Sequence, residues 1–93
     1  MAKRILVIDD EAYARQLVRA LLERAGYEVL TASSADEGLR VMRESRPDMV
    51  TVDLMMPGRS GLDLLSEKLT DTEIQPIPSL VLSAVGLNAD LER

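Results

Sequence analysis

The sequence predicts an α/β domain in which a parallel β-sheet carries helices on both faces, the doubly wound arrangement. Short runs rich in aliphatic and β-branched residues alternate along the chain with amphipathic segments of helical period. The first and third of these runs end at or just before an aspartate, and the fourth ends just before a serine. Strands and helices that alternate at this spacing form βαβ units with right-handed crossovers. Within one domain, residues 1–93, we expect strands at 4–8, 27–32, 48–53 and 80–82.

Amphipathic segments are expected to form the helices between these strands. The first, from Glu11 to Ala25, has apolar residues in the i, i+3, i+4, i+7 pattern, with Asp10 in place for an N-cap and Gly26 for the C′ residue. Ser34 and Glu37 match a capping box at the start of the second. The apolar stripe of the first helix consists of Ala14, Leu17, Val18, Leu21 and Ala25. The later helices are expected to run to about residue 44, over 61–69, and onward from Asn88.

Composition excludes several kinds of chemistry. The chain has no Cys and no His, which removes disulfides, zinc–thiolate sites, thiol catalysis and the common general base. The net charge is −5 with scattered basic residues, which argues against binding of nucleic acid or an anionic membrane by this segment. Apolar runs are far shorter than the ~20 residues that span a bilayer, so we expect no membrane segment and a cytoplasmic protein. Any chemistry here must rest on carboxylates, hydroxyls, Lys or Arg, and a hard metal.

Three carboxylates and a hydroxyl fall where the predicted strands end. Asp9 and Asp10 follow the first strand, Asp53 closes the third, and Ser83 follows the fourth. In a parallel α/β sheet the ligand site lies beyond the carboxyl ends of the strands. Taken singly, each residue is more often a turn or cap residue. Together, three converging carboxylates repel one another by about 4 kcal/mol per pair at 4 Å and an effective dielectric near 20. Mg²⁺, which prefers carboxylates, water and phosphate oxygens, would relieve that repulsion.

Three segments of the sequence resemble the CheY-like receiver domain of bacterial two-component response regulators. They are "ILVIDDE", "DMVTVDLMMPGRSG" and "LVLSA". The resemblance implies a flavodoxin-like sheet with strand order 2-1-3-4. It implies a phosphoaccepting switch that receives a phosphoryl group on Asp53 from the phosphohistidine of a sensor histidine kinase or a phosphotransfer protein. Such a domain assists its own phosphorylation and dephosphorylation and is not a turnover enzyme. Nucleophilic attack by a carboxylate needs no general base, so the absence of His is consistent with this role.

The resemblance also implies a role for each site residue. Mg²⁺, or Mn²⁺ as the alternative ion, would be held by Asp9, Asp10, Asp53 and the backbone carbonyl of Met55. Ser83 would hydrogen-bond the phosphoryl group, and Ala84 would leave room for it. The turn after the phosphoacceptor is matched by Pro57-Gly58 and Gly61.

The sequence departs from the family pattern at its C-terminal end. The pattern includes a fifth strand that ends on a Lys, and a fifth helix, whereas this sequence stops at Arg93; Lys3 and Lys68 are its only lysines and neither is a credible substitute. We therefore expect a receiver domain that is incomplete at its C-terminus. An open fourth strand would invite pairing with another chain, so we also expect a homo-oligomer.

Two other functions compete with the phosphoaccepting receiver. The first is an interaction module or scaffold fragment that keeps the receiver fold without phosphorylation and oligomerises through the edge of the fourth strand. The second is a Mg²⁺-dependent phosphohydrolase of the haloacid-dehalogenase type. That type has a second Asp two residues after its nucleophile, where this chain has Met55. Neither phosphate-binding glycine motif of nucleotide-binding proteins is present.

Overall fold

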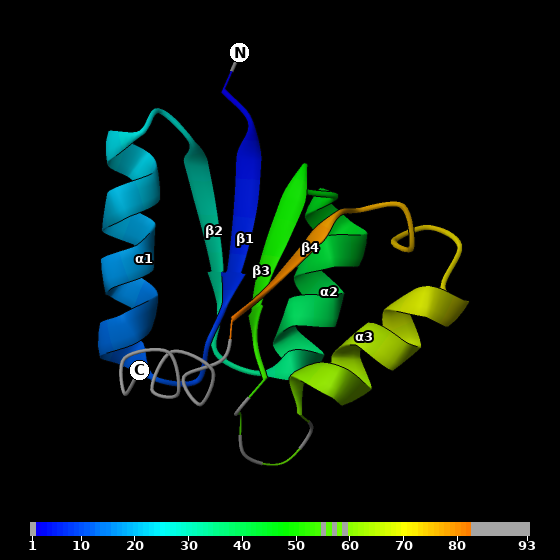
Figure 1. Cartoon of the computed structure of the whole chain (residues 1–93). Coiled ribbons are helices and arrows are strands. Elements are labelled where there is room, and N and C mark those ends of the chain that lie inside the picture. The colour runs from blue at the N-terminus through cyan, green and yellow to red at the C-terminus, as the bar shows by residue number, and fades with distance from the viewer. Residues whose placement is uncertain (1, 55, 57, 59, 83–93) are drawn as a thin grey trace, which may run out of the picture.

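The computed structural model describes residues 2–54, 56, 58 and 60–82. In these ranges a four-stranded parallel sheet has the order β2-β1-β3-β4. The strands are β1 (Arg4–Ile8), β2 (Glu28–Ala32), β3 (Met49–Asp53) and β4 (Ser79–Leu82). The helices are α1 (Ala12–Arg24), α2 (Ala35–Ser45) and α3 (Gly61–Thr70). The predicted fold class and strand order are confirmed (Figure 1). The helix expected from Asn88 lies outside the described residues.

The two faces of the sheet are set by the alternation of side chains along each strand. Leu6 and Ile8 of β1 point to the same face as Val50 and Val52 of β3, with which they pair in register. Helix α2 packs on this face over β1 and β2, and α3 packs against α2. Helix α1 lies on the opposite face, over β2 and β1 (Figure 1). The main hydrophobic core, on the α2 face, consists of Leu6, Ile8, Ala32, Ala35, Leu39, Met42, Val50, Val52, Met56, Leu64, Ile74 and Ile77.

Two details of the predicted helix starts are corrected. Asp10 is not the N-cap of α1: that residue is Glu11, whose carboxylate accepts a hydrogen bond from the Tyr13 amide. At α2, Ser34 is the N-cap and accepts from the Glu37 amide, as predicted. The Glu37 carboxylate, however, accepts from the Ser33 amide instead of returning to Ser34.

The apolar stripe predicted for α1 is present but little buried. Leu17 is 50% exposed and Leu21 is 58% exposed, and no residue of α1 is fully buried. The helical period identifies a stripe, but it does not show how much of that stripe a neighbour covers. Gly26 does follow the helix in the left-handed conformation expected for C′, with φ 99°.

Candidate functional site

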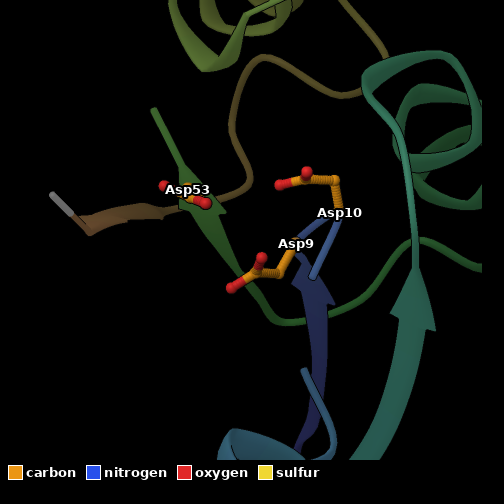
Figure 2. Close-up of side chains that lie close together, drawn as sticks. All are labelled: Asp9, Asp10 and Asp53. Carbon is orange, nitrogen blue, oxygen red and sulfur yellow. The ribbon is translucent and has the colours of Figure 1, made fainter. Parts of the chain in front are cut away.

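The end of β1 and the end of β3 bring three carboxylates together. Ile8 pairs with Val52 across the two parallel strands, so Asp9 and Asp53 come next at neighbouring positions of the sheet edge. Asp10 follows in the turn that leads to α1. One oxygen from each of the three carboxylates lies within 4.8 Å of the others. Figure 2 shows the side chains projecting into one shared space. The convergence inferred from strand topology is therefore present.

Asp9 is held firmly in this cluster. It is 8% exposed. Its amide donates to the Ala32 carbonyl at the end of β2, over 3.1 Å. Its carboxylate Oδ1 accepts from the Glu11 amide at 3.0 Å, which closes a tight turn before α1. This turn explains the helix start: the Glu11 amide is already bonded to Asp9, and Glu11 itself takes the capping position.

Asp9 is electrostatically strained. Burial raises the pKa of its carboxyl, the hydrogen bond from Glu11 lowers it, and the charges of Asp53, Asp10 and Glu11 raise it, so that the net pKa lies above the ordinary value of 3.8. Asp10, by contrast, is exposed, and Asp53 is half-buried. The cluster therefore concentrates negative charge where one member has lost much of its hydration.

Two glycines allow helices to approach the site closely. A Cβ on Gly61, the first residue of α3, would lie 2.7 Å from the Asp53 carbonyl oxygen and 2.9 Å from Leu54 Cα. Real Cβ atoms essentially never come so near to backbone, so glycine lets the start of α3 sit directly against the end of β3. A Cβ on Gly38 of α2 would meet the end of the Ile8 side chain, which can shift, so the need for glycine there is weaker than at Gly61.

The donor set of the cluster fits a hard divalent cation. All three side chains offer carboxylate oxygens, and a bound cation would relieve the repulsion among their closely spaced charges. Met55, Ser83 and Ala84 lie outside the described residues, so their expected roles stay predictions.

Sequence reasoning missed Arg15, whose guanidinium Nη1 donates to the Asp9 carbonyl oxygen at 2.8 Å. No sequence signal pointed to it, because the contact depends on how α1 leaves the turn.

A parallel sheet of order 2-1-3-4 with three acids at its carboxyl edge agrees with the receiver class of signalling domains that the sequence resembles. The family model for the response regulator receiver domain matches residues 5–93, and the chain belongs to that family. Receiver domains generally accept a phosphoryl group and bind Mg²⁺ at an acidic pocket, and they interact with histidine kinases or phosphotransfer proteins.

Individual relatives agree with this assignment. The chain is 37% identical over 86 residues to the phosphate regulon transcriptional regulatory protein PhoB of Pseudomonas aeruginosa, covering 92% of this chain and 38% of PhoB. It is 32% identical over 93 residues to the polar-differentiation response regulator DivK of Brucella anthropi, covering all of this chain and 76% of DivK. The N-terminal domain of a response regulator receiver protein from Methanoculleus marisnigri superposes with a TM-score of 0.85 at 37% identity, over 87% of this chain and 66% of that one.

This chain thus spans well under half the length of PhoB. Among the residues that the structure describes, no helix is long and apolar enough to cross a membrane.

Proposed function

We propose that this chain is a Mg²⁺-dependent phosphoaccepting receiver in which Asp53 takes a phosphoryl group from the phosphohistidine of a partner kinase or phosphotransfer protein. The observation that carries the proposal is the convergence of Asp9, Asp10 and Asp53, with carboxylate oxygens within 4.8 Å of one another. Three acids at one sheet edge are costly to a fold without a cation, and they match the needs of phosphoryl transfer.

Each residue has a distinct part in the proposed reaction. Asp53 is the nucleophile: one of its carboxylate oxygens forms a bond to phosphorus while the bond from phosphorus to the donor imidazole nitrogen breaks. A carboxylate has no proton to lose, and the leaving imidazole takes its proton from solvent. Asp9, Asp10 and Asp53 would hold the Mg²⁺ together with the backbone carbonyl of Met55. The bound Mg²⁺ would supply charge neutralisation for the transferring group.

Two residues after β4 complete the proposed site. The Ser83 hydroxyl would donate a hydrogen bond to a phosphoryl oxygen, and the small Ala84 would leave space beside it. The acyl phosphate on Asp53 would then bias the conformation of the domain, as charge-adding modifications do elsewhere. In this proposal the chain assists its own phosphorylation and dephosphorylation and is not a turnover enzyme.

Phosphorylation from a small-molecule donor tests the proposal directly. Wild-type protein incubated with Mg²⁺ and acetyl phosphate should gain one phosphoryl group by intact mass, and the gain should disappear with EDTA. Asp53→Asn should abolish it. Asp48→Asn is the matched control, because Asp48 lies just before the other end of β3, where its carboxylate accepts from the Arg4 amide. An adduct that persists in Asp53→Asn, or no adduct in the wild type, would contradict the proposal.

A second candidate function rests on the exposure of β4. Leu80, Val81 and Leu82 are each at least 38% exposed, and β4 carries no charged residue that would discourage pairing with another strand. This edge supports the alternative of an interaction module that pairs β4 with β4 of a second copy. A two-fold axis would make that pairing antiparallel.

Sedimentation of wild type and Val81→Lys tests this alternative. A dimer that Val81→Lys dissociates supports it, and a wild-type monomer at high concentration contradicts it. An Asp53 adduct on a monomeric protein favours the phosphoaccepting receiver alone.

A further inference from the structure

Arg15 lies outside the acidic cluster but contacts its backbone. It sits in the first turns of α1, six residues after Asp9, and its guanidinium Nη1 donates a partly buried hydrogen bond to the Asp9 carbonyl oxygen at 2.8 Å. Its own amide begins the helical hydrogen bonding by donating to the Glu11 carbonyl at 3.0 Å. The side chain thus reaches back from the helix across the turn to the end of β1.

With this bond, Asp9 is fixed at three points. The sheet holds its amide through Ala32, the turn holds its carboxylate through the Glu11 amide, and Arg15 holds its carbonyl. The first contact sets the strand end. The turn closed by the Asp9 carboxylate and the Glu11 amide encloses the Asp9–Asp10 peptide, and the Arg15 bond adds a second constraint directly on the carbonyl of that peptide.

The Asp9 carbonyl belongs to the same rigid peptide plane as the Asp10 amide. A donor that fixes the carbonyl therefore also fixes where the chain places the amide and the Cα of Asp10. Asp10 is exposed, and within the described ranges no residue donates a hydrogen bond to its carboxylate. Besides the turn closed by the Glu11 amide, the Arg15 bond is therefore the side-chain contact through which the structure can orient Asp10.

We infer that Arg15 is a positioning residue of the acidic site: it fixes the Asp9–Asp10 peptide so that both carboxylates face Asp53. The inference rests on the proposed function, since it assigns Arg15 a role in holding the cation ligands. Partners that orient metal ligands from outside commonly change metal affinity by 10–100-fold when removed. Arginine suits the task because its planar guanidinium presents its N–H donors in a fixed geometry, so that one of them can stay on the carbonyl.

The competing explanation is that Arg15 merely stabilises α1. The two differ in what they predict for the folded protein. If Arg15 only stabilises the helix, replacing it lowers the free energy of unfolding and leaves the cation affinity of the folded molecule unchanged. If Arg15 is a positioning residue, replacing it weakens cation binding even under conditions where the variant is fully folded.

Cation titration of three variants decides between them. Dissociation constants for Mg²⁺ are measured by calorimetry, and for Mn²⁺ by electron paramagnetic resonance, on protein shown to be folded by circular dichroism. Arg15→Met should weaken binding about 10-fold, and Arg15→Lys should recover part of the loss. Arg19→Met is the matched control: Arg19 is on the same helix one turn later, carries the same charge and pairs with Glu23 over 3.3 Å. It should change the affinity by less than about two-fold.

A metal-free measurement adds independent evidence. In EDTA, the nuclear magnetic resonance signal of the Asp10 amide should shift and its hydrogen exchange should speed up in Arg15→Met but not in Arg19→Met. Wild-type affinity in Arg15→Met overturns the inference, and so does an equal loss in Arg19→Met, which would reflect charge alone.

The phosphorylation assay keeps the two proposals separable. A wild type that binds Mg²⁺ but gains no phosphoryl group contradicts the proposed function. The cation affinities of the Arg15 and Arg19 variants then still decide whether Arg15 is a positioning residue. A wild type that binds neither cation overturns both.

Discussion

On one face of the sheet, α2 and α3 cover a continuous core whose central side chains, such as Leu39 and Leu64, are about 1% exposed or less. On the other face, α1 lies over β1 and β2 with no fully buried residue, and Leu17 and Leu21 are half-exposed. The acidic site stands at the edge where both faces end. The comparison indicates that the α2 face supplies most of the stability of the described fold, while the α1 face supplies contacts that shape the site.

The largest expected effect separates the two faces directly. Leu39→Ala should lower the free energy of unfolding by about 2–5 kcal/mol, because it empties a fully packed position. Leu21→Ala removes the same atoms from a side chain that is 58% exposed, and should cost less than about 1 kcal/mol. Urea unfolding of both variants measures the difference. Equal losses would show that the α1 face is packed as well as the other.

The next effect concerns the edge that the two faces share. Asp9→Asn keeps an oxygen for the Glu11 amide but removes a charge from the cluster, and should raise the metal-free free energy of unfolding by about 1–2 kcal/mol at pH 7, part of the Coulomb repulsion among the acids. It should also weaken Mg²⁺ binding. Urea unfolding in EDTA and in Mg²⁺ measures both. A metal-free variant less stable than wild type would show that the Asp9 charge is well accommodated.

The same carboxyl makes a prediction about pH. The pKa of Asp9 is raised above 3.8, so between 3.8 and the raised value the folded chain binds more protons than the unfolded chain. The ionised Asp9 carboxylate therefore lowers the free energy of unfolding fully at neutral pH, and this loss disappears as pH falls through the raised pKa. The pKa of Asp71, bonded by Arg43, is lowered, so its stabilising contribution is lost only below 3.8. Asp9→Asn should remove the first of these pH dependences and leave the second.

A smaller effect sharpens the description of the α1 face. Thr51 and Thr31 flank Val7 on this face in neighbouring strands. Thr51 is 4% exposed, and among the described residues its buried hydroxyl has no hydrogen-bond partner. Thr31 is only partly buried. Thr51→Val should therefore raise the free energy of unfolding by about 1 kcal/mol. Thr31→Val should change it by less than about 0.5 kcal/mol. Thermal or urea unfolding checks the pair, and a destabilised Thr51→Val would reveal a partner for that hydroxyl.

The smallest effect compares how the helices of the two faces end. After α1, the left-handed position is Gly26; after α2 it is Arg46, at φ 46°, where a Cβ is unfavourable. Arg46→Gly should add about 0.5 kcal/mol of stability, since its exposed ion pair with Glu73 contributes little. Gly26→Ala should subtract about 1 kcal/mol. If Arg46→Gly is destabilising, the side chain contributes more than its exposure indicates.

Much of the fold followed from local patterns. β-branched runs located the strands to within a residue or two, and the capping residue Ser34 located α2. The convergence of Asp9, Asp10 and Asp53 followed from parallel topology, because the carboxyl ends of neighbouring strands must meet.

What sequence could not supply depended on tertiary contacts. Asp10 looked like the N-cap of α1, but the Asp9 carboxylate takes the Glu11 amide and moves the helix start by one residue. No sequence pattern singled out Arg15, because its bond to the Asp9 carbonyl exists only once the turn has formed. The exposure of Leu17 and Leu21 likewise depends on what lies next to α1 in space.

The pairing of Ile8 with Val52 has a practical consequence for anyone producing this domain. A slip of β3 by a single residue against β1 would turn Asp53 toward the hydrophobic core and separate it from Asp9. Only correctly aligned strands can present all three acids to one ion. If the proposed Mg²⁺ site is present, the fraction of protein molecules that bind the cation would therefore equal the fraction whose β1 and β3 are correctly aligned. This fraction can be measured before any phosphoryl donor is added.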